Sequence, residues 1–158
     1  MFGDEVLKDQ GATPEQIATH PHPYYAPIAA FGSEYMLEPV AYGLKFAGSL
    51  AGGTMIDAGF TEKLQAAGVN ATAYAAKMEY GTTAVVILNK DVDNDLTLRL
   101  TFEDAGAASV VTQPLLASGL DSREALIPPS KIPLKLRDGI FTASVPHASG
   151  LLVRAAFS

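Results

Sequence analysis

Residues 131–145, KIPLKLRDGIFTASV, indicate the fold class of this chain. Asp138-Gly139 is a signal for a two-residue type I′ turn between antiparallel strands. The register that such a turn imposes places the apolar side chains of both strands on one face. The pairs it brings together are Leu136–Phe141, Leu134–Ala143 and Ile132–Val145. Pro133 lies on the other face, and its missing N–H group indicates an edge strand.

Other stretches from residue 70 onward are also typical of β-strands. In LTLRLTF (96–102), leucine and phenylalanine alternate with threonine and arginine, as in a half-buried strand. TAVVILN (83–89) is apolar on both faces, which predicts a central strand covered on both sides. Further strands are expected in NATAYAAKM (70–78), ASVVTQPLL (108–116) and SGLLVRAAF (149–157). The prediction is a mainly β fold, an antiparallel β-sandwich of about seven or eight strands with one N-terminal helix.

The predicted helix lies in EPVAYGLKFAGSLAGG (38–53). Pro39 suits a first helical turn and Gly52-Gly53 a helix end. We therefore divide the chain into an irregular segment with a loop (1–36), the helix (37–52) and the sandwich (53–158). One face of the helix carries Val40, Leu44, Ala47 and Ala51, and the adjacent face carries Gly43, Phe46 and Leu50. This apolar stripe is wider than a surface helix needs, so the sandwich, residues 1–36 or another chain must cover it.

The composition narrows the classes of partner. The net charge is −6 without a basic block, which argues against nucleic acid and anionic membranes as partners. No apolar run approaches the roughly 18 residues of a membrane span, and the acidic start MFGDEVLKDQ lacks the layout of a signal peptide. The chain has no cysteine, so thiolate chemistry and disulfides are excluded and the compartment stays open.

The acidic run DVDND resembles a calcium loop only in part. Asp91, Asp93 and Asp95 alternate as calcium ligands do, but Leu96 and Phe102 stand at the sixth and twelfth positions, where such a loop needs Gly and Glu. We therefore predict a polar turn between two strands.

No catalytic, metal or cofactor site is expected from the remaining polar residues. His20, His22 and His147 lack the spacing of a zinc ligand set. Glu34 and Glu38 are four residues apart and could share a helix face, but Glu38 is better explained by the favourable charge interaction at a helix N-terminus. The chain has neither a Gly-rich phosphate loop nor a nucleophile elbow.

The order of three segments resembles the end of glycoside hydrolase family 79, the β-glucuronidases and heparanase-like enzymes. The segments are YYAPIAAF (24–31), EPVAYGLKFAG (38–48) and AYAAKMEYGTTAVVILNKD (73–91). Their most specific parts are Tyr25-Ala26-Pro27-Ile28, Pro39 followed by Ala41-Tyr42-Gly43, and Leu88-Asn89-Lys90-Asp91. The resemblance covers roughly residues 23–158.

The resemblance implies a place for each segment in a retaining glycosidase. In that family a (β/α)8 barrel carries the chemistry and a C-terminal β-sandwich packs against it. The helix from Pro39 would be the last barrel helix, and His22, Tyr24 and Tyr25 would lie on a loop facing the substrate. The family's two catalytic glutamates lie on barrel strands upstream of everything in this chain. The resemblance therefore implies that this chain alone does not hydrolyse glycosides.

Three functions follow as hypotheses. The first is a non-catalytic sandwich module that supports a barrel absent from this chain. The second is a free-standing module that binds glycan through exposed tyrosines, with Tyr24, Tyr25, Tyr74 and Tyr80 as candidates. The third is one subunit of a split hydrolase. The first and third predict association with a barrel, or self-association, through the helix at 39–51.

Overall fold

The computed structural model describes residues 11, 13–15, 27–31, 34–58, 68–102, 107–117, 125–126, 135–137 and 139–157. The chain forms two compact units, an N-terminal unit of residues 1–45 and a C-terminal unit of residues 46–158. The boundary between them lies within helix α3 (Pro39–Ala47). Each unit is described by itself.

The N-terminal unit contains a two-stranded hairpin followed by most of helix α3. Strands β1 (Ile28–Phe31) and β2 (Glu34–Leu37) pair antiparallel, with Ile28 opposite Leu37. The N–H group of Glu38, at the start of the helix, donates to the carbonyl oxygen of Pro27 at 3.0 Å. The prediction of irregular structure through residue 36 is therefore wrong for these strands. Gly32-Ser33 is a hairpin-turn signal between two apolar runs, and this signal could have identified them.

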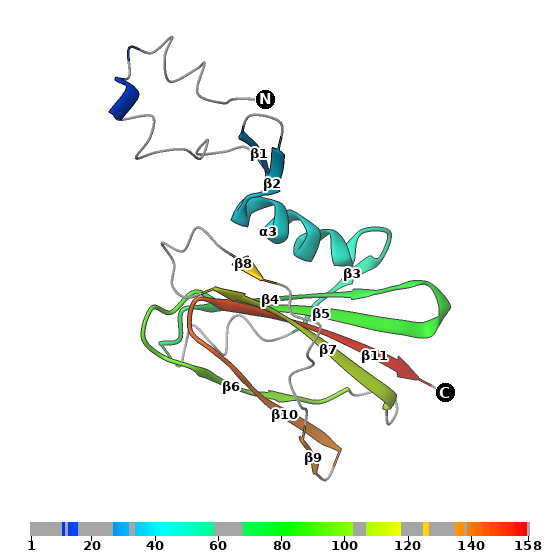
Figure 1. The fold of residues 1–158 in the computed structure, drawn as a ribbon. Coiled ribbons are helices and arrows are strands. Elements are labelled where there is room, and N and C mark those ends of the chain that lie inside the picture. Colours follow the sequence, from blue (N-terminus) through cyan, green and yellow to red (C-terminus); the bar gives the residue numbers. More distant parts are fainter. Residues whose placement is uncertain are drawn as a thin grey trace. The chain divides into compact units, whose positions relative to one another are not determined.

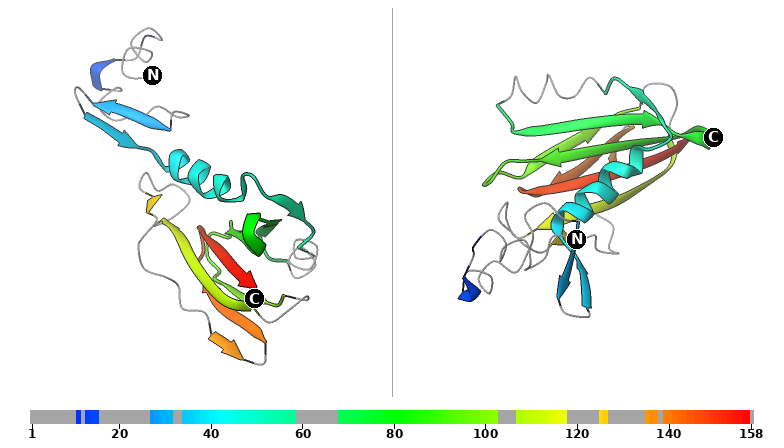
Figure 2. Two further views of the ribbon diagram at one scale, coloured as in Figure 1. Left: turned by 90° about the vertical axis from the view of Figure 1, so that its right-hand side faces the viewer. Right: turned by 90° about the horizontal axis from the view of Figure 1, so that it is seen from above.

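The C-terminal unit is a sandwich of a six-stranded and a three-stranded sheet, as far as the structure describes it (Figures 1 and 2). The large sheet has the order β3-β4-β5-β11-β7-β8 and the small sheet the order β6-β10-β9. The strands are β3 (Thr54–Ile56), β4 (Ala71–Lys77), β5 (Thr82–Asn89), β6 (Leu96–Leu100), β7 (Ala107–Ala117), β8 (Ala125–Leu126), β9 (Lys135–Arg137), β10 (Ile140–Val145) and β11 (Ser149–Phe157). Every described pairing is antiparallel, which confirms the predicted fold class.

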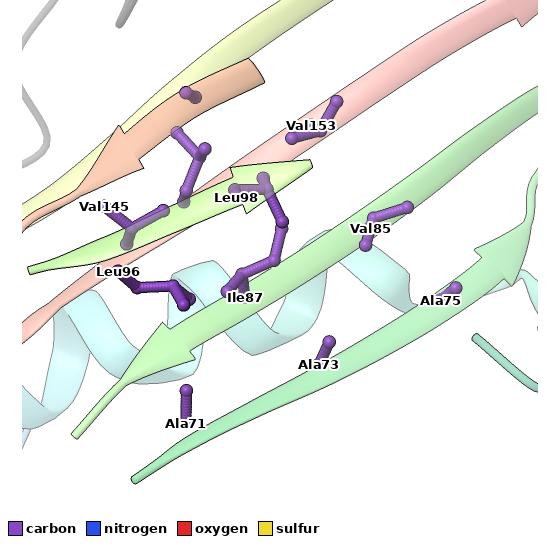
Figure 3. Close-up of a cluster of buried hydrophobic side chains, with 11 residues drawn as sticks. Ala71, Ala73, Ala75, Val85, Ile87, Leu96, Leu98, Val145 and Val153 are labelled. Carbon is purple, nitrogen blue, oxygen red and sulfur yellow. The ribbon is translucent and has the colours of Figure 1, made fainter. Parts of the chain in front are cut away.

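The main core lies between the two sheets. Figure 3 shows side chains of β4 and β5 pointing toward those of β6 and β10. Ile87 of the large sheet and Leu98 of the small sheet are fully buried there. On β6, Leu96 and Leu98 are buried while Thr97 and Arg99 are exposed, as the alternating pattern predicts. Side chains that alternate in this way place a continuous apolar layer between the sheets.

The structure confirms the pair nearest the turn in the hairpin predicted from residues 131–145. Phe141 lies opposite Leu136, and Gly139 has the positive φ (75°) that a type I′ turn requires. Strand β9 lies at the edge of the small sheet. The other two predicted pairs involve residues 131–134, which lie outside the described part of the chain.

Strand β5 lies inside the large sheet and is covered on both faces, as predicted. Val85 and Ile87 face the core between the sheets. Ala84 and Val86 face a second cluster that contains Phe46 and Leu152. Phe46 ends helix α3 together with Ala47, and a 3₁₀ turn (η1, Gly48–Leu50) continues it. Helical structure thus occupies 39–50 of the predicted 37–52.

Tyr80 is held in an unfavourable backbone conformation in the turn η2 (Glu79–Gly81) between β4 and β5. Its φ is 62° and its ψ is 29°, and the next residue, Gly81, also has a positive φ of 69°. The left-handed conformation costs a residue with a Cβ roughly 1–2 kcal/mol, whereas asparagine tolerates it better.

Replacing Tyr80 by asparagine is therefore expected to stabilise the protein by about 1 kcal/mol. The ring of Tyr80 is 96% exposed, so its removal costs no packing within the fold. Urea denaturation followed by circular dichroism measures the difference. Tyr74→Asn is the control, because residue 74 has ordinary strand geometry and asparagine is unfavourable in a strand. Unchanged or lower stability of Tyr80→Asn would contradict the strain argument.

Candidate functional site

The N-terminal unit presents an apolar surface, here called the hairpin–helix patch. It consists of Ile28 (49% exposed), Leu37 (52%), Val40 (44%) and Leu44 (61%). Ile28 and Leu37 are opposite each other on the hairpin. Val40 and Leu44 are four residues apart and therefore share one face of helix α3. Large aliphatic side chains exposed on adjoining elements are typical of surfaces that contact another protein.

Phe46 uses the adjacent face of the helix within the C-terminal unit. Its side chain is 2% exposed and packs with Ala84, Val86 and Leu152. A Cβ added at Gly150 would lie 3.0 Å from Cε1 of Phe46, so the glycine lets the ring approach strand β11 closely. The sequence left open which of the two apolar faces the sandwich covers. In the structure Phe46 and Leu50, which belong to the C-terminal unit, pack with Ala84, Val86 and Leu152 of the large sheet.

A polar corner holds together the two loops that cross between the sheets. One loop joins β5 to β6 and the other joins β10 to β11. Asn89 is 2% exposed, and its Nδ2 donates to the carbonyl oxygens of Asn94 (2.9 Å), Val145 (3.1 Å) and Pro146 (3.1 Å). Its Oδ1 accepts the N–H of Asp91 at 3.1 Å. One side chain thus links both loops.

Two aspartates complete the corner. Oδ1 of Asp91 accepts the N–H groups of Asp93 (3.0 Å) and Asn94 (2.9 Å), which confirms the predicted polar turn. Oδ1 of Asp95 accepts the N–H of His147 at 3.0 Å and lies 3.2 Å from its Nδ1. These donated hydrogen bonds lower the pKa of both carboxyls, chiefly through the N–H of Asp93 for Asp91 and the N–H of His147 for Asp95.

The hydrogen bonds to Asp91 and Asp95 predict that the stability of the protein depends on pH in the acid range. A carboxyl whose pKa is lower in the folded protein than in the unfolded chain stabilises the fold above the unfolded pKa, and this stabilisation is lost as the pH falls through the folded pKa. We expect the unfolding free energy to fall as the pH drops below about 5, and Asp91→Asn/Asp95→Asn to make that fall shallower. Urea titrations at successive pH values test this. Asp93→Asn is the control, and equal slopes for wild type and the double variant would contradict the assignment.

The structure describes only some of the site residues predicted from the sequence. His20, His22, Tyr24 and Tyr25 lie outside the described residues, so the substrate-facing loop stays a prediction. Tyr74 and Tyr80 are both exposed.

The two glutamates do not share a helix face, which corrects that possibility. Glu34 belongs to strand β2, and Glu38 lies between that strand and the helix. The turn signal at Gly32-Ser33 explains the error, because it starts a new strand at residue 34.

The described ranges contain neither a metal-ligand cluster nor a membrane-spanning helix. No three histidine, aspartate or glutamate side chains come together there as a ligand set. No described helix has the length and apolarity to cross a membrane.

Comparison with known proteins yields matches among solved structures only. No protein-family model matches the chain. No curated protein matches it either.

The GH51 arabinofuranosidase from Xanthomonas axonopodis pv. citri is similar in structure, with a TM-score of 0.59 and 14% identity over 82% of this chain and 28% of that one. AbfB, a family 51 α-L-arabinofuranosidase from Bifidobacterium longum, gives a TM-score of 0.46 and 19% identity over 54% of this chain and 18% of that one. The catalytic domain of GH30 xylanase C from Talaromyces cellulolyticus gives a TM-score of 0.43 and 23% identity over 56% of this chain and 18% of that one. The chain thus spans less than a third of each of these structures. The similarity to the Xanthomonas enzyme shows a shared fold, so this chain has a fold that occurs within glycoside hydrolases.

Proposed function

We propose that this chain is a non-catalytic β-sandwich module that supports the (β/α)8 barrel of a glycoside hydrolase, as in family 79. The observation that carries the proposal is the fold shared with part of the Xanthomonas arabinofuranosidase over 82% of this chain. The sequence resemblance to the end of family 79 enzymes, over residues 23–158, supports the same role. The chain alone is not expected to hydrolyse glycosides. The retaining reaction needs two carboxyl groups about 5–5.5 Å apart across the sugar, and in family 79 both belong to barrel strands upstream of the segments that this chain resembles.

The hairpin–helix patch supports a docking role. Its four side chains are 44–61% exposed, although leucine, isoleucine and valine are among the residues most often buried. Full burial of such a side chain contributes about 1.5–3 kcal/mol, so covering four partly exposed ones supplies a useful share of the free energy of association. Within this proposal, His22, Tyr24 and Tyr25 lie on the substrate side of the barrel. The barrel is either part of the same protein or a separate subunit.

A change of charge in the patch tests the proposal. Val40→Asp/Leu44→Asp is expected to abolish association with the barrel of a family 79 enzyme expressed without its own sandwich. Isolated aspartates buried in an apolar interface lose hydration without gaining a partner. The measurement is sedimentation velocity of mixtures, together with the melting temperature of the barrel, which the wild-type chain should raise.

The matched control places the same chemical change elsewhere. Val92 is 58% exposed on the loop between β5 and β6, and Val92→Asp should leave the association unchanged. Association that survives the double change would show that the patch is not the docking face. Absence of association for the wild-type chain, with a folded barrel, would overturn the proposed function. Sedimentation of the chain alone over a concentration series tests self-association through the same patch.

A further inference from the structure

The outer face of the large sheet, which points away from the small sheet, is poor in charge along β5, β11 and β7. Residues of these strands alternate between the core and the outer face, and Ile87, Leu151 and Val153 belong to the core. Apart from Arg154, the outward residues are alanine, valine, leucine, glycine, serine, threonine and glutamine. A face of an antiparallel sheet that meets only water is expected to be polar instead.

The outer face of the small sheet has the polar composition that the large sheet lacks. In this sheet Leu98 and Phe141 are buried, so the alternate residues point outward. They are Thr97 and Arg99 of β6, Thr142 and Ser144 of β10 and Arg137 of β9, with Ile140 as an apolar exception. The small sheet thus has a face suited to water, whereas the outer face of the large sheet is patterned as a contact surface.

Part of the outer face of the large sheet stays exposed on β7 and β11, which lie side by side (Figure 1). Phe46 covers the outer face at β5. Beyond it, the side chain of Val111 is 45% exposed, and Arg154, directly opposite on β11, is exposed as well. The next outward pair is Ser109 and Ala156, exposed and half-buried respectively. We call these four residues the β7–β11 face.

Arg154 has no partner within the part of the chain that the structure describes. No hydrogen bond or ion pair joins its guanidinium to another described residue. Two further charged residues lie near the turn between β4 and β5. Lys77 ends β4 on the core side of the sheet by alternation, Glu79 belongs to the turn, and neither pairs with Arg154. Because a guanidinium binds a carboxylate through two parallel hydrogen bonds, a partner suited to this face offers a carboxylate.

The composition of the β7–β11 face favours a protein partner other than a second copy. Arginine is enriched in protein–protein interfaces, and lysine, glutamate and aspartate are depleted. A two-fold dimer would bring the same patch together from both copies, and this patch holds no carboxylate for either arginine. We therefore propose, on the basis of the proposed function, that the β7–β11 face docks on the barrel where the barrel presents a carboxylate to Arg154. This contact belongs to the C-terminal unit and is additional to that of the hairpin–helix patch.

Reversal of the charge at residue 154 tests this contact. Arg154→Glu is expected to weaken association with the barrel of a family 79 enzyme, expressed without its own sandwich, by at least about thirtyfold. Val111→Asp should weaken it by at least about tenfold, because the new carboxylate is buried without a partner. Sedimentation velocity of mixtures measures the affinity, and circular dichroism checks that both variants melt as the wild type does.

Arg99→Glu is the matched control, because it makes the same change at an exposed arginine on the outer face of the small sheet. It should leave the association unchanged. Labelling of arginines with phenylglyoxal, followed by mass spectrometry of the wild-type chain, gives a second readout. The barrel should protect Arg154 from the reagent and leave Arg99 reactive.

The outcomes separate this contact from the proposed function itself. Wild-type association that survives Arg154→Glu, with Arg154 still reactive in the complex, would overturn the contact and leave the supporting role intact. Absence of association between the wild-type chain and a folded barrel would overturn both. Self-association of the wild-type chain that Arg154→Glu removes, without any binding to the barrel, would assign the β7–β11 face to a second copy and refute the barrel as its partner.

Discussion

Replacing Phe46 by alanine is expected to lower the free energy of unfolding by about 3–5 kcal/mol. The ring is 2% exposed and packs against the outer face of the large sheet, next to Ala84, Val86 and Leu152. The space left behind cannot close easily, because its lining belongs to the central strands β5 and β11, which are paired on both edges. Urea denaturation monitored by circular dichroism gives the difference in free energy.

Leu44→Ala is the matched control for Phe46→Ala. Leu44 is 61% exposed on the same helix, so its truncation should change stability by less than about 0.5 kcal/mol. Similar losses for the two variants would mean that the sheet does not anchor the helix through Phe46. A loss for Phe46→Ala alone would show that Phe46 anchors the end of the helix to the sheet.

Replacing Asn89 by alanine is expected to cost about 2–4 kcal/mol, because several carbonyl groups near the core lose their donor together. The lost hydrogen bonds are those from Nδ2 to the carbonyl oxygens of Asn94, Val145 and Pro146, and that from the N–H of Asp91 to Oδ1. Since these bonds join the two loops that cross between the sheets, their loss should loosen both loops. Hydrogen exchange of the amides at 91–95 and 147–148 would follow that loosening directly.

Two further variants separate the contributions at this corner. Asn70→Ala removes one exposed hydrogen bond, from Nδ2 to the carbonyl oxygen of Lys90 at 3.2 Å. It should lower the free energy of unfolding by well under half as much as Asn89→Ala does. Asn89→Asp keeps the acceptor for the N–H of Asp91 but removes the donors, and it places a carboxylate against three carbonyl oxygens. It should therefore destabilise at least as much as alanine. Equal effects of Asn70→Ala and Asn89→Ala would refute the central role of Asn89.

The strands were predicted well where the pattern lies within the strand or in its adjoining turn. The alternation in 96–102, the two-sided apolar run at 83–89 and the Asp138-Gly139 turn predicted β6, β5 and the hairpin of β9 and β10. A period of two and a turn that needs positive φ are properties of neighbouring residues, so they can be read without the rest of the fold. The hairpin of β1 and β2 was missed because prolines and alanines around it hide the alternation.

The candidate surfaces depended more on the tertiary structure. The sequence identified Tyr74 and Tyr80 as aromatic candidates, but their exposure and the left-handed backbone of Tyr80 are visible only in the fold. The hydrogen-bonding role of Asn89 could not be predicted from the sequence, because two of its acceptors, Val145 and Pro146, are more than fifty positions away in the chain.

The sequence by itself determined the fold class, the antiparallel pairing and an apolar helix that needs a cover on more than one side. Only the tertiary structure decided that Phe46 is the helix residue that packs on the sheet. Several residues of the helix are apolar, so hydrophobicity alone does not single out Phe46. Shape does, because Gly150 and Ala84, on strands far apart in the sequence, leave room for one aromatic ring, and such a fit exists only once those strands have come together.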